Sequence, residues 1–327
     1  MTVVGHEWAL DLLLNGLAME RVSHATLIVG PPNIGKTTIA CVFAQALNCT
    51  GGQPVPCGEC LSCLKVVSGN HPDVRIMDAP DQTLKISEVR DLQRELALSP
   101  HEGHWRVVVL SGFERATTEA ANALLKTLEE PPAQVVLVLT ATEADVLLPT
   151  IVSRCQVLSL RPLSTASVKE ALMSQWGSQP EQAELLAHLS GGRLGWAVRA
   201  LEDEGLLVRR DEHLDNLVSL MSKGRVERLA YAAELSRDLG LVREVLGLWL
   251  GWWRDVMLLA SGSQVAIINV DQEPVLREQA GQVTIQQAQR MVARLRSIAM
   301  NIDRNVNPRL AIEVLLLSLP SALSLSN

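Results

Sequence analysis

A glycine-bounded stretch near the start of the chain has the residue types and spacing of a phosphate-binding loop. The pattern G-x-x-x-x-G-K-[ST] is matched from Gly30 to Thr37. In such a loop, backbone N–H groups at the start of the following helix point at phosphate oxygens, and the helix dipole favours negative charge there. Gly35 permits close approach of the backbone, the Lys36 ammonium would reach the β- and γ-phosphates, and the Thr37 hydroxyl would bind Mg²⁺. The stretch predicts a site for ATP or ADP with Mg²⁺, and a chance glycine-rich turn is the alternative. The predicted nucleotide contacts are Gly30, Pro31, Pro32, Asn33, Ile34, Gly35, Lys36, Thr37 and Thr38.

Four of the six cysteines lie close together in the chain, with the spacing Cys49-x7-Cys57-x2-Cys60-x2-Cys63. Thiolates separated by two residues form the knuckles of a tetrahedral zinc site. Four sulfur ligands would fill the coordination sphere, so no position would remain for a catalytic water. The spacing therefore predicts a structural Zn²⁺ site in an insert over residues 49–63, with an iron–sulfur cluster or free thiols as alternatives.

The carboxylates that ATP hydrolysis requires are missing where they are expected. In a phosphate-loop NTPase, one strand ends in an acidic residue that helps to hold Mg²⁺, often followed by a glutamate that orients the attacking water. Here the apolar run 106–110 leads into Ser111 and Gly112, and Glu114 comes two residues too late, beyond a glycine. The sequence predicts nucleotide binding without autonomous ATPase activity.

Two further polar residues flank predicted strands. Thr142 follows the apolar run 135–139, and its hydroxyl would either touch a γ-phosphate or take part in ordinary turn chemistry. Arg154 lies in the triplet Ser153-Arg154-Cys155 before the run 156–160. It is either a solvated surface charge or an arginine that projects into the nucleotide site of another subunit. The residues alone leave these alternatives open.

The phosphate loop needs a strand before it and a helix after it. Residues 25–29 form a short apolar run that predicts a buried strand, and apolar residues recur at helical spacing over 36–47. Other predicted strands cover 73–77, 106–110, 135–139 and 156–160, and other predicted helices cover 85–98 and 118–130. Beyond residues 161–164 strand signals cease and helical periodicity continues to the end. There, three tryptophans are predicted to be core residues rather than base-stacking surfaces: Trp249, Trp252 and Trp253.

Composition narrows the function classes. The chain has 327 residues, a net charge of −7 and a pI near 5.6. The negative net charge argues against a protein that binds nucleic acid through its overall charge alone. Residues 1–11 lack the basic start and apolar core of a signal peptide. The longest uncharged run of the most apolar late segment, 245–253, is far short of the ~20 residues that span a bilayer. We therefore expect a cytoplasmic protein without a membrane partner.

Taken together, these stretches resemble the clamp-loader branch of the AAA+ proteins. The resemblance rests on the phosphate loop, the four-cysteine insert directly after its helix, and three later stretches: residues 122–132, Ser153-Arg154-Cys155 and Asn307-Pro308-Arg309. It implies an α/β AAA+ phosphate-loop domain with a five-stranded parallel sheet over 1–162, a small helical lid over 163–205 and a helical collar over 206–327. It also implies a hetero-pentamer with gamma/tau and delta types of subunit, which places a sliding clamp on primer-template DNA in replication by DNA polymerase III.

Two departures from the motor subunits of that family favour a stator of the delta-prime type. Gamma/tau motors carry an Asp-Glu pair where this chain has Ser111 and Gly112. Their lid arginine corresponds here to Gly195, with Arg193 only nearby. Arg154 matches the family arginine that reaches the nucleotide of a neighbouring subunit, so the resemblance implies a trans arginine finger.

Two other functions compete with the stator. The first is a hydrolysing gamma/tau-type ATPase in which Glu114 substitutes for the missing acid. The second is a stand-alone nucleic-acid remodeller, which the acidic balance and the lack of a base-reading motif disfavour.

Overall fold

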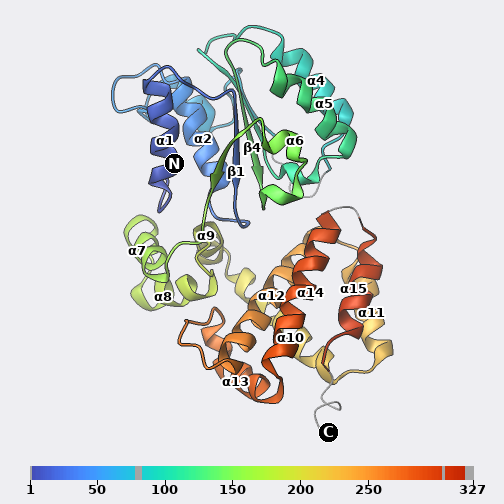
Figure 1. Cartoon of the computed structure of the whole chain (residues 1–327). Coiled ribbons are helices and arrows are strands. Elements are labelled where there is room, and N and C mark those ends of the chain that lie inside the picture. Colours follow the sequence, from blue (N-terminus) through green and yellow to red (C-terminus); the bar gives the residue numbers. More distant parts are fainter. Residues whose placement is uncertain (1, 78–82, 304–305, 321–327) are drawn as a thin grey trace. The chain divides into compact units, whose positions relative to one another are not determined.

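The computed structural model describes residues 2–77, 83–303 and 306–320. The chain divides into two units, Met1–Leu163 and Ser164–Asn327, each with its own hydrophobic core (Figure 1). The first unit thus ends one residue after the predicted nucleotide-binding domain. The predicted separation of a lid from a collar at residue 205 remains a prediction.

Five short strands form the centre of the first unit. They are β1 (Ala25–Val29), β2 (Val74–Met77), β3 (Arg106–Leu110), β4 (Val135–Ala141) and β5 (Gln156–Ser159). The spatial order is β2-β3-β4-β1-β5, and every neighbouring pair is parallel. Because the strands are parallel, all their carboxyl ends lie at one edge of the sheet. The predicted α/β domain with a sheet of five parallel strands is confirmed.

Helices cover both faces of this sheet. They are α1 (Glu7–Ala18), α2 (Lys36–Leu47), α3 (Leu61–Val67), α4 (Ile86–Leu96), α5 (Thr118–Glu129) and α6 (Pro149–Val152), with two short 3₁₀ turns, η1 (Phe113–Arg115) and η2 (Ala144–Val146). Figure 1 shows α1 and α2 on one side of the sheet and α4 and α5 on the other. The three central strands β3, β4 and β1 are therefore buried on both faces, which explains why they read as continuous apolar runs, whereas the edge strands β2 and β5 are partly exposed.

Alternation along the strands divides the core of the first unit into two layers. In β3, Val108 and Leu110 pack with α4 and α5, whereas Val107 and Val109 pack with α1 and α2. A fully buried Val or Leu contributes about 1.5–3 kcal/mol of transfer free energy, so this central strand anchors both helical layers. The Thr117 hydroxyl accepts from the Ala120 N–H and caps α5.

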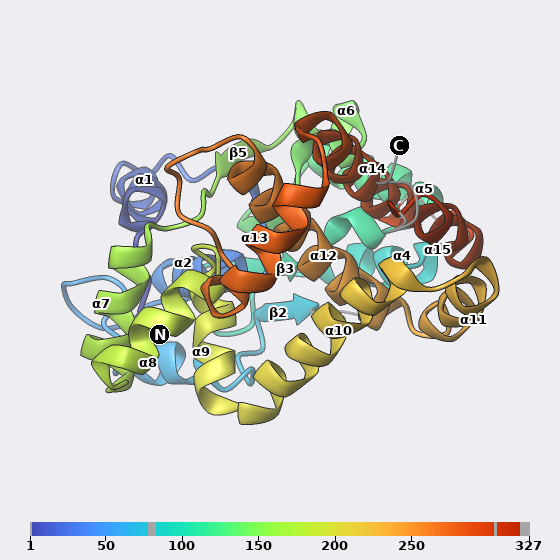
Figure 2. The same ribbon diagram turned by 90° about the horizontal axis from the view of Figure 1, so that it is seen from below.

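The second unit is helical. Its elements are α7 (Thr165–Trp176), α8 (Pro180–Leu189), α9 (Leu194–Glu202), α10 (Glu204–Ser222), α11 (Arg225–Leu235), α12 (Leu239–Ala260), η3 (Val270–Gln272), α13 (Glu273–Gln282), α14 (Ile285–Asp303) and α15 (Pro308–Leu317). The helices α7, α8 and α9 pack on one another and lie side by side in both views (Figure 1 and Figure 2). The long helix α12 packs against α10, α13 and α14.

The three tryptophans of α12 are core residues, as predicted. Trp249, Trp252 and Trp253 are 0%, 1% and 0% exposed. Two of them also satisfy their indole N–H groups, which donate to the His213 carbonyl oxygen and to Gln279 Oε1. They cannot serve as stacking surfaces for bases. Within the described residues, no helix combines the length and apolarity that crossing a bilayer would need.

Candidate functional site

The phosphate loop connects the carboxyl end of β1 to the first turn of α2. Gly30 N–H donates to the Ala141 carbonyl at 3.1 Å, which ties the loop to the end of β4. Ile34 is buried and packs into the core beneath α2. Gly35 caps α2 with a φ of +105°, in the left-handed region that glycine adopts without strain. This loop conformation leads directly into the amino end of α2, where unpaired N–H groups are available to an anion.

The ammonium group of Lys36 is held by its own loop. Lys36 Nζ donates to the carbonyl oxygens of Gly30 at 2.6 Å and Pro31 at 2.9 Å. Burial lowers the pKa of Lys36 from 10.5 to about 8, while the nearby Glu114 charge raises it and the Arg115 charge lowers it. Phosphate oxygens would replace two neutral carbonyl oxygens as acceptors, and this exchange would favour the charged form of the lysine.

A hydroxyl lies where a carboxylate would be needed to support Mg²⁺. Ser111 directly follows β3, and its Oγ is 3.3 Å from Thr37 Oγ1. A neutral serine oxygen supplies no negative charge to a cation held by Thr37. The geometry therefore matches the sequence-based expectation that the acid at the end of this strand is missing.

The next position is also unsuited to a catalytic glutamate. Gly112 has a φ of +62°, and a Cβ built there would collide with the guanidinium group of Arg115. The same guanidinium donates to the Ser111 carbonyl oxygen at 3.1 Å. Glu114 lies on η1, and its charge reaches Lys36 electrostatically. Glu114 is the acidic residue that the sequence offers as a substitute.

Thr142 and its neighbour Thr140 have different surroundings. Thr142 follows the last residue of β4, beside the strand that leads into the phosphate loop. Its hydroxyl makes no hydrogen bond to another described residue. The buried Thr140 instead accepts from the Gly112 N–H at 3.0 Å and ties the end of β4 to the turn after β3. The sequence does not predict this contact, because nothing in the pattern distinguishes Thr140 from Thr142.

Arg154 lies on the surface of the first unit, two residues after α6. Its guanidinium is 2.7 Å from Glu129 Oε1, an ion pair with the last residue of α5. It also donates to the Thr150 carbonyl at 2.9 Å and to Ser153 Oγ at 3.4 Å. The Arg154 side chain is 35% exposed, so the guanidinium remains accessible to another chain.

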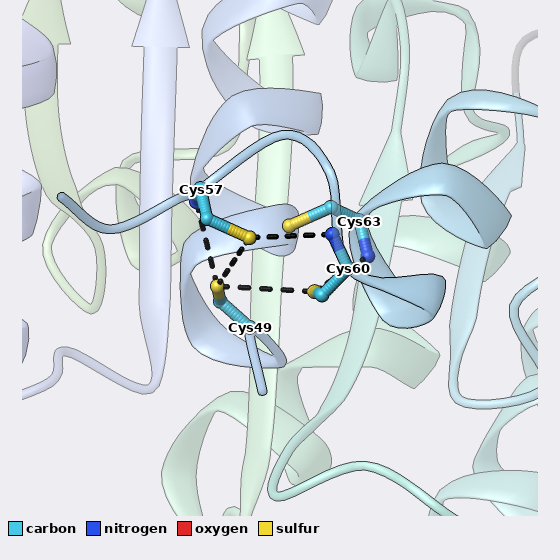
Figure 3. Close-up of side chains that lie close together, drawn as sticks. All are labelled: Cys49, Cys57, Cys60 and Cys63. Carbon is cyan, nitrogen blue, oxygen red and sulfur yellow. Dashed lines mark hydrogen bonds between the residues drawn. The ribbon is translucent and has the colours of Figure 1, made fainter. Parts of the chain in front are cut away.

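The four clustered cysteines come together beside the carboxyl end of α2 (Figure 3). All four sulfur atoms lie within 4.8 Å of one another. Cys49 Sγ is 3.6 Å from Cys57 Sγ and 4.0 Å from Cys60 Sγ. A tetrahedral zinc ion with Zn–S bonds of about 2.3 Å requires sulfur–sulfur edges of about 3.8 Å. The donor set therefore fits one tetrahedral ion, and it leaves too little room for a cluster of several irons.

Backbone donors lower the pKa of two of these thiols. The Cys63 N–H donates to Cys60 Sγ, and this bond is the main reason why the pKa of Cys60 falls to about 5. The pKa of Cys57 is also lowered, by the N–H groups of Glu59 and Cys60. Burial raises the pKa of Cys63 to about 12, so this thiol needs a cation to lose its proton. Gly51 has no room for a side chain, because a Cβ there would lie 2.5 Å from Cys57 Sγ.

A polar network ties the cysteine insert to the sheet. The Asn48 side chain exchanges two 2.9 Å hydrogen bonds with the backbone of Trp105, just before β3. The Ser62 hydroxyl donates to the Asn48 carbonyl at 2.6 Å and lies 3.1 Å from His71 Nε2. The sequence alone gives almost no sign of this network. The one signal available was that Asn48 directly precedes the first cysteine.

Two family models match this chain. The model described as "DNA polymerase III, delta subunit" matches residues 5–164. The model described as "DNA polymerase III, delta subunit, C terminal" matches residues 204–320. The first match covers the sheet, the phosphate loop and the cysteine insert, and the second covers α10 to α15.

Curated relatives carry related names. DNA polymerase III subunit delta' of Bacillus subtilis is 29% identical over 95% of this chain and 94% of its own length. DNA polymerase III subunit tau of Escherichia coli is 35% identical over 62% of this chain, which spans only 32% of that relative. Among solved structures, a DNA polymerase III gamma subunit-related protein from Thermotoga maritima is 19% identical. It is covered over 98% of its chain and 95% of this one, with a TM-score of 0.42.

Proposed function

Because the chain belongs to the DNA polymerase III delta subunit family, we propose that it is a clamp-loader stator of the delta-prime type. In this role the chain holds a nucleotide passively in its own phosphate loop. It donates Arg154 to the ATP of a neighbouring gamma/tau-type subunit. The cysteine cluster binds one structural Zn²⁺ and stiffens the insert after α2. The assembly, a hetero-pentamer that also holds a delta-type subunit, loads the sliding clamp on primed DNA in the cytoplasm.

One observation carries the stator role: the pairing of Thr37 with Ser111. The two hydroxyl oxygens are 3.3 Å apart, in the place where a Mg²⁺-supporting carboxylate belongs. Gly112 stands where the water-orienting glutamate belongs, and its φ of +62° would strain a glutamate even if the flexible end of Arg115 moved aside. A triphosphate in this loop would meet cationic and neutral groups but neither of the two carboxylates.

We expect the isolated chain to hydrolyse ATP no faster than its Lys36→Ala variant. The physical reason is that, without the two acids, the loop can bind the phosphates but can neither support Mg²⁺ fully nor activate water. Steady-state phosphate release from both proteins is the measurement. Turnover that is lost in Lys36→Ala and also in Glu114→Gln would instead establish the gamma/tau-type alternative.

Nucleotide affinity is expected to fall as the pH rises. The pKa of Lys36 is about 8 in the free protein, and a bound phosphate would raise it back toward its usual value. The protonated form that binding requires is therefore abundant below pH 8 and lost above it. Linkage predicts about tenfold weaker binding at pH 9 than at pH 7. A titration with a fluorescent ADP analogue measures this change.

The matched variant for this prediction is Lys36→Arg, because its guanidinium keeps its charge over the whole range. Its affinity should be nearly flat between pH 7 and pH 9, even if it is weaker overall. An equal fall in both proteins would show that another group controls the pH dependence.

A further inference from the structure

Arg154, the proposed trans arginine, forms an ion pair with Glu129 of its own chain. The two side chains come from the ends of different helices, and their charged atoms are 2.7 Å apart. Glu129 is the last residue of α5, and Arg154 comes two residues after α6. The helices pack on each other, and Leu128 and Ile151 are both buried in the same core layer. The backbone at both ends of the ion pair is thus fixed, while the charged groups themselves reach solvent.

The position of Glu129 runs against the local electrostatics of its helix. The carboxyl end of a helix carries partial negative charge, which disfavours acidic residues there. Glu129 and Glu130 nevertheless occupy the last residue and the cap of α5. Glu129 is offset by the Arg154 guanidinium, whereas no ion pair involves Glu130 within the described residues. A residue whose charge is unfavourable at its place in a helix, and is offset by one specific partner, is a candidate for a functional role.

The other contacts of Arg154 come from its own turn. Nη1 donates to the Thr150 carbonyl at 2.9 Å and to Ser153 Oγ at 3.4 Å, while Nη2 faces Glu129. The guanidinium is planar and has five N–H donors in a fixed geometry, so holding both terminal nitrogens fixes its plane. The Nε–H makes no hydrogen bond to any described residue and remains available for an acceptor from outside.

We propose that Glu129 is the positioning residue for Arg154, holding the guanidinium in one orientation before it meets the phosphates of a neighbouring subunit. This inference rests on the proposed trans role of Arg154. An arginine that is already oriented loses less side-chain freedom when it binds, so more of its attraction to the phosphates is retained. Glu129 itself touches no reacting atom.

The test uses Glu129→Ala with Glu130→Ala as the matched control, because the two variants remove adjacent exposed carboxylates. An exposed ion pair usually contributes a factor of about five or less, so the expected loss is about threefold to fivefold. The loss should appear in the kcat of ATP turnover by an assembly with gamma/tau-type and delta-type subunits, with KM little changed. Glu130→Ala should match the wild type. Glu129→Gln keeps an oxygen acceptor and should recover part of the loss.

A second measurement needs no partner. In the isolated chain, the NMR order parameter of the Arg154 Nε–H should fall in Glu129→Ala and stay unchanged in Glu130→Ala. An unchanged order parameter in Glu129→Ala, or a rise in turnover by the assembly, overturns the positioning role. If Arg154→Ala lowers turnover and Glu129→Ala does not, this inference fails while the proposed function stands. If Arg154→Ala has no effect, the proposed function itself fails.

Discussion

Replacing Arg154 with alanine is expected to lower ATP turnover about a thousandfold or more at the motor site that adjoins this chain. Arginine fingers stabilise the charge that develops on the transferred phosphoryl group, and their loss typically costs a factor of about 10³–10⁵ in kcat. If several motor sites contribute to turnover, the full loss applies to the site that adjoins this chain. Single-site turnover, measured in an assembly whose other motor sites are inactivated, isolates that contribution.

The same substitution should leave the fold intact. The contacts of Arg154 are a solvent-exposed ion pair and hydrogen bonds within its own turn, which together stabilise the fold by about 1 kcal/mol at most. The matched control is Arg161→Ala, which removes another exposed arginine of the same unit. Its turnover should equal that of the wild type. An Arg154→Ala complex that is as active as Arg161→Ala would remove the trans role.

The strands and helices of the first unit could be predicted well because each carries its own signal. The run Val135–Leu139 has the length and the β-branched residues of a buried strand, and the structure extends it by two residues to Ala141. Thr117 and Thr118 are both of the residue type that caps a helix, and in the structure the Thr117 hydroxyl accepts from the N–H three residues later. These are local interactions, and a single sequence contains them in full.

Contacts between distant elements could not be predicted in the same way. Glu129 ends α5 and Arg154 lies two residues after α6, and no periodicity in the sequence predicts that the two side chains meet. The same holds for Asn48 and Trp105, which are 57 residues apart and form a two-way hydrogen bond. The loop contacts of Lys36 are a different case. The sequence pattern describes a lysine that meets phosphates, whereas the free loop offers carbonyl oxygens to the same ammonium group.

Spacing and topology together account for what was predictable about the site. In a parallel sheet the residues after β1, β3 and β4 must meet at one edge, so the phosphate loop, Ser111 and Thr142 were bound to be neighbours. The side-chain contacts that decide the chemistry do not follow from spacing and topology. Only the structure shows that Ser111 pairs with Thr37 and that Arg115 fills the space beside Gly112.

Removal of the proposed zinc ion is expected to unfold the insert locally. A four-ligand zinc site contributes on the order of 10 kcal/mol of binding free energy, which is comparable to the stability of a whole domain. Without the ion, the Cys57 and Cys60 thiolates would repel each other at close range, and the backbone bonds that lower their pKa would be lost. When a chelator is added, we expect the Cys63 and Leu64 amides to lose their protection from hydrogen exchange. Amides of the central strand β4 should keep theirs.

The matched pair of variants for this prediction is Cys57→Ser and Cys155→Ser. Cys57 is one of the four clustered residues, whereas Cys155 is a free, half-buried cysteine outside the cluster. We expect one zinc per chain in the wild type and in Cys155→Ser, and less than one in Cys57→Ser. Metal analysis of the purified proteins measures this directly. Wild-type protein that contains no zinc and melts at the same temperature with and without chelator would contradict a structural metal. The cysteines would then hold the insert by their hydrogen bonds alone, and the short 3.6 Å contact between Cys49 and Cys57 would be a thiol–thiolate bond.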